Sequence, residues 1–301
     1  MKYFLCIPDG GFNDTFCQIE RAYKYSMRHK RRLIINTEHC GLHDRLDNYF
    51  CTDNPAIALH PSEELLSELN QLDVFPAFNV SLKEYLQNCS VLPRMESLNK
   101  FGGTTPDLKK DYRERLVVFH NGGGGKNSFR PFANLMLKKQ LAENITAQLS
   151  ERSVCGDYDA IHVRNTDYTT DFKSFFNTLR ETVKNRKLLI CSDDWDCREY
   201  AKSFFDQSEV VTAADIKNTG GVPLHTLTTD VYANNRSMLA DLVALSGAKR
   251  LFFTSATPDG EPSGFSTLAD SLRQHRDIRR FMLTGTKGPL YGIKYRLLGY
   301  R

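Results

Sequence analysis

The sequence lacks the features that mark several classes of protein. No apolar run approaches the ~18 residues of a membrane-spanning helix, and the opening residues, MKYFLCIPDGGF, lack the long apolar core of a secretory signal. The eight cysteines are scattered through 301 residues, with no C-x-x-C pair and no histidine at zinc-ligand spacing. We therefore expect a cytoplasmic protein with free thiols, in which the five N-x-S/T sequons arise by chance.

The chain also has little excess of charge. It carries 40 Lys and Arg against 36 Asp and Glu, a net charge of +4. Six of the basic residues and no acidic residue follow Asp277, which leaves 34 basic against 36 acidic residues in positions 1–277. A body without a basic excess lacks the electrostatic footprint of a nucleic-acid-binding protein. We therefore expect no nucleic-acid partner.

What is present is an ordinary globular composition in a chain long enough for two domains. Hydrophobic residues make up 41% of the sequence and charged residues 25%, and the mean hydropathy is −0.44. At about 100–200 residues per domain, the length favours two domains. We place them at 1–150 and 151–277, followed by a basic, aromatic tail at 278–301.

Hydrophobic periodicity alternates between short apolar runs and amphipathic stretches. The runs predict buried strands at 2–7, 33–37, 116–120, 159–164, 187–192, 209–213 and 250–255. The amphipathic stretches predict helices at about 12–29, 62–72, 131–150, 171–186, 195–206, 234–247 and 265–275, whereas residues 38–112 are otherwise irregular. Repeated strand–helix–strand units require parallel sheets covered by helices. The pattern predicts an α/β protein with two Rossmann-like domains facing across a cleft.

Loops at the carboxyl ends of the strands are candidate sites, because open parallel sheets bind ligands there. Gly10 and Gly11 lie between the first strand and its helix, where paired glycines let the backbone approach an anion and the helix offers free N–H groups. A plain turn explains the same residues. A second glycine run, 122–125, fails the P-loop pattern because His120 and Asn127 stand where Gly and Ser or Thr are needed. It indicates either a phosphate- or sugar-contacting loop or a hinge.

His162 and Arg164 end the first strand of the second region. Side chains alternate along a strand, so both point to the same face. A guanidinium at a strand end is suited to bidentate binding of a diphosphate. The alternative is a structural ion pair between Arg164 and a nearby acid such as Asp167.

Acidic and serine-containing segments follow later strands. Asp193, Asp194 and Asp196 offer carboxylates to a divalent cation, but capping of the following helix explains them as well, so we expect no metal. Asp241, within an apolar helix, can accept from the N–H groups of a guanine edge. Segment 263–266 (SGFS) can donate to phosphate oxygens from its hydroxyls and from the amides of the helix it opens. An exposed acid and a capping serine are the alternatives.

Taken together, these motifs resemble the fucosyltransferase superfamily of glycosyltransferases, which includes the α1,2-, α1,6- and protein O-fucosyltransferases. His162-Val163-Arg164-Asn165-Thr166-Asp167 is similar to the H-x-R-x-x-D motif of that superfamily, its most specific element. Three other segments also resemble its motifs: Gly10-Gly11-Phe12-Asn13, Ser192-Asp193-Asp194, and the residues from Asp241 to Ser263-Gly264-Phe265-Ser266. The resemblance covers the second domain well and the first only at its opening loop.

The resemblance implies a GT-B architecture with an acceptor-side first domain and a donor domain after it. It also implies transfer with inversion from a nucleotide-sugar, GDP-fucose above all, to a glycan acceptor, without a required metal or cofactor. The donor-binding residues that it implies are Gly10, Gly11, Asn13, His162, Arg164, Asp193, Asp194, Asp241, Ser263, Gly264, Phe265 and Ser266. Arg164 would bind the β-phosphate, Asp241 the base, Ser263 and Ser266 the phosphates, and the paired acids the base or ribose.

The resemblance leaves two candidates for the catalytic base. We favour Asp171, near the position of an acidic residue in the α1,6 enzymes, with Asp14 as its rival, while Arg164 would offset charge on the leaving diphosphate. Asn165 departs from the usual second arginine, and residues 256–262 look inserted, whereas Tyr168 agrees with the α1,2 pattern. Two other functions stay open: a UDP-dependent hexosyltransferase, such as a galactosyltransferase, and a non-catalytic nucleotide- or glycan-binding module.

The tail interleaves basic residues with the aromatic residues Phe281, Tyr291, Tyr295 and Tyr300. Such a segment suits an anionic membrane surface, where aromatic rings lie among the headgroups. We therefore expect peripheral attachment at the inner face of the membrane, beside a lipid-linked glycan acceptor. A packed C-terminal segment is the alternative. Acceptor specificity is expected to lie in the irregular residues 38–112.

Overall fold

The computed structural model describes residues 1–89, 92–167, 169–215, 221–222, 226–255, 260–288 and 291. Tyr168, most of the insertion at 256–262 and most of the tail after 288 therefore lie outside the described residues. The chain divides into two compact units, Met1–Lys138 with Arg280–Arg301 (unit 1) and Lys139–Arg279 (unit 2). The first division falls before residue 150 because the helix that begins at Lys139 packs within unit 2, against the helix Val231–Gly247.

Unit 1 is built on a five-stranded parallel sheet in the order β4-β2-β1-β6-β5. Its strands are β1 (Tyr3–Pro8), β2 (Arg32–Ile35), β4 (Ile57–Ala58), β5 (Val74–Phe75) and β6 (Leu116–Asn121), and β3 (Phe50–Cys51) pairs separately with β7 (Met136–Leu137). Its helices are α1 (Phe12–Arg28), α2 (Glu63–Leu69), α3 (Leu82–Cys89) and α4 (Arg94–Phe101), with short 3₁₀ turns η1 (Leu46–Asn48) and η2 (Arg130–Ala133). The strand–helix–strand unit predicted at the start of the chain is confirmed.

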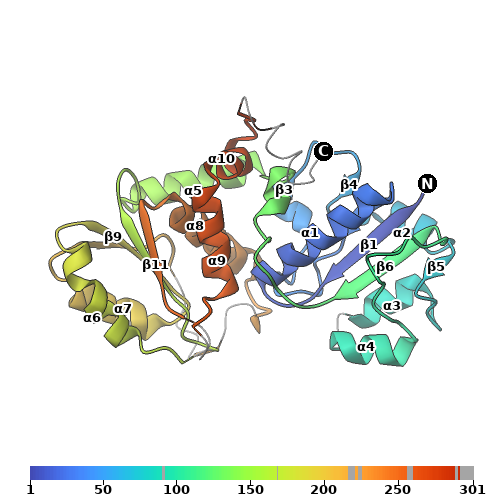
Figure 1. The fold of residues 1–301 in the computed structure, drawn as a ribbon, viewed down its shortest axis with the longest axis horizontal. Coiled ribbons are helices and arrows are strands. Elements are labelled where there is room, and N and C mark those ends of the chain that lie inside the picture. The colour runs from blue at the N-terminus through green and yellow to red at the C-terminus, as the bar shows by residue number, and fades with distance from the viewer. Residues whose placement is uncertain are drawn as a thin grey trace. The chain divides into compact units, whose positions relative to one another are not determined.

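Both faces of the unit 1 sheet are covered by helices, which explains why its central strands read as continuous apolar runs. On one face, alternate residues Tyr3, Leu5 and Ile7 pack with α2, α3 and α4. On the other face lies α1 (Figure 1), and the ring of Tyr25 packs 4.5 Å from that of Phe4 between centroids.

The predicted helix at 131–150 is wrong over residues 131–138. The helix α5 begins only at Lys139, and the residues before it form η2 and β7. Pro131 opens the 3₁₀ turn, and Leu137 then pairs with Phe50 in a short antiparallel ladder. Phe132 is buried among Phe16 and Phe50, so its apolar character reflects packing of a loop and not helical periodicity.

Unit 2 is built on a four-stranded parallel sheet in the order β10-β9-β8-β11. Its elements are α5 (Lys139–Glu151), β8 (Asp159–Val163), α6 (Phe172–Val183), β9 (Lys187–Ser192), α7 (Trp195–Phe204), β10 (Glu209–Val211), α8 (Val231–Gly247), β11 (Arg250–Phe253) and α9 (Gly264–Gln274). Side chains of α6 and α7 pack against Ile161, Val163, Leu188 and Ile190 on one face. The helices α5, α8 and α9 lie on the other (Figure 1).

A buried carboxylate fastens the amino edge of the unit 2 sheet. Asp159 is fully buried and accepts hydrogen bonds from Arg186 and, at 2.9 and 2.6 Å, from Arg250. Burial raises the pKa of Asp159, but the hydrogen bonds and charges of Arg250 and Arg186 outweigh burial, so its pKa lies below the ordinary value. The ion pairs of Asp159 with the two arginines therefore stabilise the fold above the pKa of the unfolded state, about 3.9. This contribution is lost as the pH falls through the lower pKa of the folded state.

We expect Asp159→Asn to lower the free energy of unfolding by about 2 kcal/mol at neutral pH, because it leaves two arginines without their shared counter-ion. The difference from the wild type should shrink as the pH falls below about 4. Urea unfolding at pH 7 and pH 3 measures both values. A deficit that is the same at both pH values would contradict the charge assignment.

The described part of the tail is packed. The helix α10 (Arg276–Thr284) buries Ile278, Phe281 and Met282, and the ring of Phe281 packs 5.0 Å from that of Tyr291. The hydroxyl of Tyr291 donates to the carbonyl of Ala133 at 2.8 Å. Two of the four aromatic side chains that suggested membrane attachment are therefore buried in the protein.

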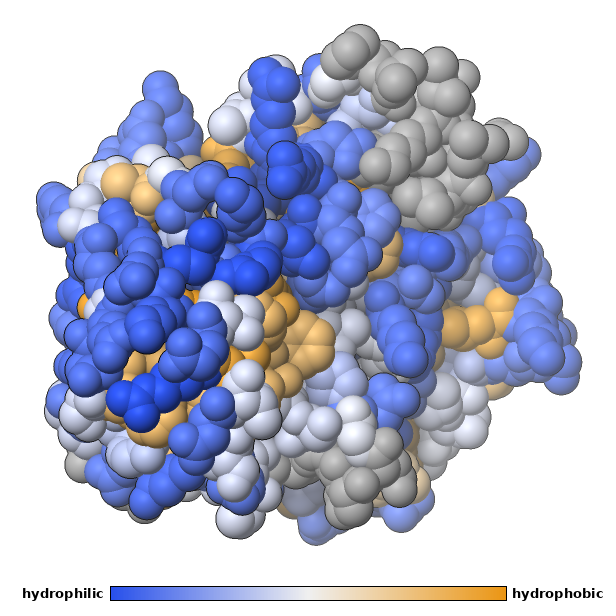
Figure 2. Space-filling view, turned by 60° about the vertical axis from the view of Figure 1, so that its left-hand side comes forward, coloured by the Kyte–Doolittle hydropathy of each residue, from blue (hydrophilic) through white to orange (hydrophobic). Residues whose placement is uncertain are grey.

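The surface seen in Figure 2 is mostly hydrophilic, with hydrophobic residues scattered between polar ones. Within the described ranges, no helix combines the length and the apolar character needed to cross a membrane.

Candidate functional site

The most polar cluster of predicted residues lies at the carboxyl edge of the unit 2 sheet. Arg164 follows β8, and its Nε and Nη2 donate to both carboxylate oxygens of Asp167 at 2.6 and 2.5 Å. Its Nε also lies 3.7 Å from Asp193, which follows β9. The guanidinium is partly exposed. The structural ion pair considered from the sequence is thus present, at the place where a diphosphate was expected.

Asn165 organises the loop that carries Arg164. Its backbone N–H donates to Asp193 at 2.8 Å, and its side-chain amide donates to Asp194 at 2.5 Å. Its Oδ1 accepts from the backbone N–H of Thr170 at 2.8 Å and from the Thr170 hydroxyl at 3.0 Å. Asn165 therefore joins the loops after β8 and β9. A second arginine in this position could not do the same, because its side chain has no oxygen to accept hydrogen bonds from Thr170.

The two neighbouring acids have different partners. Asp193 accepts from Asn165 and from the hydroxyl of Thr166 at 2.6 Å. Asp194 caps α7, accepting from the backbone N–H of Asp196 at 2.8 Å and of Cys197 at 3.4 Å. Across the residues that the structure describes, no group of three His, Cys, Asp or Glu side chains is arranged to hold a metal ion.

His162 connects β8 to the first turn of α9. Its Nδ1 lies 2.7 Å from the hydroxyl of Ser266, which lies 2.8 Å from that of Ser263. The Ser263 hydroxyl also caps α9 by accepting from the Ser266 N–H at 3.1 Å. Burial, followed by the charges of Arg164 and Arg198, lowers the pKa of His162 to about 3. The imidazole is therefore neutral at physiological pH, and the two hydroxyls are engaged within the protein.

The residues Gly264 and Phe265 begin α9 directly after the capping Ser263. The ring of Phe265 lies 5.4 Å from the His162 ring between centroids. Because the first N–H groups of a helix have no intrahelical partner, this helix end offers donors to an anion beside the Arg164 loop.

Asp241 has a partner that the sequence did not reveal. Arg198, buried on α7, donates from Nη2 to Asp241 at 3.0 Å. The same guanidinium donates to the carbonyl of Ser192 at 2.8 Å and to that of Ala214 at 2.7 Å. Burial raises the pKa of Asp241 despite this partner. Arg198 thus holds together the ends of β9 and β10, and no motif in the sequence had singled it out.

Asp171 lies at the end of the same loop as Arg164. It caps α6 by accepting from the backbone N–H of Ser174 at 3.1 Å. These hydrogen bonds from Ser174 lower the pKa of the exposed carboxyl. Thr170, just before it, donates from its hydroxyl to the carbonyl of Arg164 at 3.2 Å, so the loop returns close to its starting point.

The other predicted residues lie in unit 1, where two glycine loops interlock. Gly10 has a positive φ of 91°, which favours glycine, and Gly11 is the N-cap of α1. Asn13 accepts from the hydroxyl of Ser128 at 2.6 Å. A Cβ built on Gly124 would lie only 2.3 Å from the carboxylate of Asp14, so glycine at this position allows the loop to approach α1 closely.

Carbonyls of the second glycine run are also held from α1. Arg21 donates to the Gly124 carbonyl at 2.7 Å, and the Cys17 thiol donates to that of Gly125 at 3.2 Å. These hydrogen bonds hold the second glycine run against α1, which argues against a hinge at this place.

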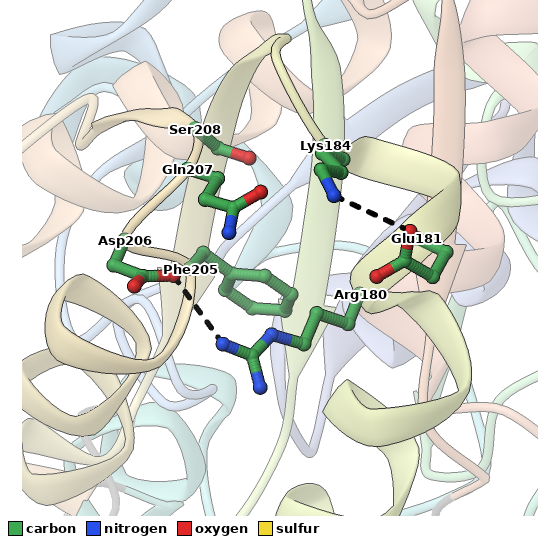
Figure 3. Close-up of a pocket in the computed structure, with 7 residues that line it drawn as sticks. All are labelled: Arg180, Glu181, Lys184, Phe205, Asp206, Gln207 and Ser208. Carbon is green, nitrogen blue, oxygen red and sulfur yellow. Dashed lines mark hydrogen bonds and ion pairs between the residues drawn. The ribbon is translucent and has the colours of Figure 1, made fainter.

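A shallow pocket lies elsewhere on unit 2 (Figure 3). It is lined by residues at the ends of α6 and α7: Arg180, Glu181, Lys184, Phe205, Asp206, Gln207 and Ser208. Ion pairs at 3.4 Å (Arg180–Asp206) and 3.7 Å (Lys184–Glu181) cross its rim. These residues precede β9 and β10, so the pocket lies at the amino edge of the sheet, opposite the Arg164 cluster.

Comparison with known proteins identifies the fold. No protein-family model and no curated protein matches the sequence. Among solved structures, the chain is similar to the α1,6-fucosyltransferase NodZ co-crystallised with GDP, at 14% identity and a TM-score of 0.60 over 90% of this chain and 93% of that one. NodZ soaked with GDP-fucose gives 15% identity and a TM-score of 0.59 over 90% and 93%. NodZ from Bradyrhizobium gives 16% and 0.60 over 90% and 94%. The chain therefore has the α/β fold of a fucosyltransferase.

Proposed function

We propose that the chain is an inverting glycosyltransferase that moves fucose from GDP-fucose to a glycan acceptor. The observation that supports this most is the polar cluster around Arg164, which occupies the carboxyl edge of a parallel sheet in a chain with the fold of a fucosyltransferase. Unit 2 would bind the donor and unit 1 the acceptor. The proposed reaction needs no metal ion.

The donor diphosphate would bind between Arg164 and the start of α9. Binding requires the phosphate to compete with Asp167 for the guanidinium, because the carboxylate accepts from Nε and Nη2. Two negative charges on a diphosphate favour the exchange. The N–H groups of Gly264 and Phe265 would stabilise the same phosphates. As the sugar leaves, Arg164 would offset the charge that develops on the diphosphate.

Buried and partly buried residues next to this site would hold its loops in place. Arg198 donates to Oδ2 of Asp241, whereas the buried Oδ1 has no hydrogen-bond partner among the described residues, so we retain Asp241 as the acceptor for the base edge that was expected from the sequence. Asp193 and Asp194 would fix the loop of Arg164 through Asn165. His162, neutral and bound to Ser266, would hold α9 in register with β8.

The catalytic base that we propose is Asp171. An acceptor hydroxyl must lose its proton as it attacks. Asp171 is an exposed carboxylate at the end of the Arg164 loop and is ionised at neutral pH, so it can accept that proton. We expect Asp171→Asn to reduce the transfer rate by about 10²- to 10⁴-fold while the melting temperature stays unchanged, because asparagine caps a helix about as well as aspartate. Initial rates of transfer and a thermal melt measure the two effects.

Asp14 is the rival base, and the variant Asp14→Asn separates the two assignments. Loss of transfer in Asp14→Asn with normal rates in Asp171→Asn would move the base to unit 1.

A second function is nucleotide binding without transfer. One observation favours it: two hydrogen bonds to Asp167 engage the Arg164 guanidinium within the protein, and transfer would need that guanidinium for the leaving diphosphate. Donor consumption distinguishes the two. The proposed transferase releases GDP from GDP-fucose in the presence of glycan acceptors, and slowly by hydrolysis in their absence. GDP binding without release under either condition would support the binding module, and release of UDP from a UDP-hexose would support the hexosyltransferase.

A further inference from the structure

The only tryptophan of the sequence is exposed beside the proposed donor site. Trp195 is the first residue of α7 and keeps 38% of its surface exposed. Within the described part of the chain, its side chain makes no hydrogen bond, ion pair or ring contact. The side chain therefore leaves more than a third of its large apolar surface open to solvent, where a ligand can contact it.

Helix geometry directs this ring towards the loops that carry the cluster. Side chains of an α-helix lean towards its N-terminus, so a residue covers the surface one turn before its own position. For the first residue of α7, that surface is the loop that follows β9. The same loop holds Asp193 and Asp194, which are bound to Asn165 beside Arg164.

The position of Trp195 is also fixed from both sides. Asp194, immediately before it, caps the helix through the N–H groups of Asp196 and Cys197. Arg198, in the next turn, binds the carbonyl of Ser192 at 2.8 Å. The ring is thus presented on a rigid support, which reduces the entropy lost when a flat ligand stacks on it.

We propose that Trp195 is the stacking platform for the nucleobase of the donor. This assignment rests on the proposed function and adds to it a residue that distinguishes a nucleotide from a bare diphosphate. Stacking on an aromatic ring is available to every base, and a purine offers the larger surface. Arg164 and the start of α9 would bind the diphosphate, while Trp195 binds the other end of the nucleotide.

The experiment uses GDP and pyrophosphate with the full chain. We expect Trp195→Ala to weaken GDP binding about tenfold, as measured by calorimetry, and to leave pyrophosphate binding unchanged. Trp195→Phe should retain most of the GDP affinity because it keeps an aromatic face. Met95→Ala removes another exposed apolar side chain, on α4 of unit 1, and should leave GDP affinity at the wild-type value.

The single tryptophan supplies an independent readout. With excitation at the red edge of indole absorption, GDP should change the fluorescence of Trp195 and protect it from iodide quenching, and pyrophosphate should do neither. Unchanged GDP affinity in Trp195→Ala, or an equal loss of pyrophosphate affinity, would overturn the assignment. GDP binding that leaves Trp195 fluorescence unchanged would overturn it while sparing the proposed function. Absence of any GDP binding would overturn both.

Discussion

Arg164→Ala is expected to reduce the rate of sugar transfer by about 10²- to 10³-fold, the size of effect seen when one group that stabilises developing negative charge is removed. The expected cost to folding is below about 1 kcal/mol, because the Arg164–Asp167 pair is partly exposed and such pairs contribute little. Initial rates with GDP-fucose and a thermal melt measure the two effects. A large loss of activity with a small loss of stability is the signature of a residue that acts on the substrate.

Two variants make this test specific. Arg180→Ala removes another arginine of unit 2 that is paired with an aspartate, Asp206, but at the opposite edge of the sheet. It should leave transfer at the wild-type rate. Arg164→Lys keeps the charge but not the planar, bidentate geometry, so it should restore only part of the activity. Near-normal transfer by Arg164→Ala would remove Arg164 from the donor site.

Arg31→Ala is expected to lower the free energy of unfolding by about 3–5 kcal/mol, the largest stability effect in unit 1. Arg31 is buried and donates to the carbonyls of Tyr112 and, at 2.9 Å, of Glu114, and to the carboxylate of Asp111 at 2.9 Å. Its loss would leave these acceptors without their donor where residues 111–114 lead into the central strand β6.

The matched control is Arg28→Ala, at the exposed end of α1 three residues earlier. It should change the free energy of unfolding by less than about 1 kcal/mol. Urea unfolding followed by far-ultraviolet circular dichroism compares the two variants. Equal effects would show that Arg31 contributes only its charge and not its buried hydrogen bonds.

The longer strands of both sheets could be predicted from the sequence because parallel strands covered on both faces leave continuous apolar runs, whereas the two-residue edge strands β4 and β5 were missed. The strand at 187–192 was predicted to the residue, and those at 2–7 and 116–120 to within one. The helices α3 and α4, of eight residues each, were missed, whereas the even shorter α2 was predicted from its capping serine. Ser81, whose hydroxyl accepts from the backbone N–H of Glu84, is the same kind of signal for α3. The sequence has no local signal for β3 and β7 because their pairing depends on segments that are far apart in the chain.

The site could be predicted at the level of loops but not of partners. The position of His162, Arg164 and the serine segment at one edge of a sheet follows from strand ends. The local pair of Arg164 with Asp167 was an alternative that the sequence offered, whereas the pairing of Asp241 with Arg198 depends on tertiary contacts. Asn165, which looked like a departure from the family pattern, is the residue that joins two loops. The packed positions of Phe281 and Tyr291 likewise could not be distinguished from a membrane-facing tail by composition.

The measurement that tests the account most directly is a thermal-shift comparison of GDP, UDP, ADP and CMP on the unmodified chain. A ligand present at ~100 times its dissociation constant stabilises the folded protein by about 2.7 kcal/mol, and the account predicts that GDP gives the largest shift and that Arg164→Ala abolishes it. A larger shift with UDP, or no shift with any of the four nucleotides, would contradict a GDP-sugar donor site in unit 2.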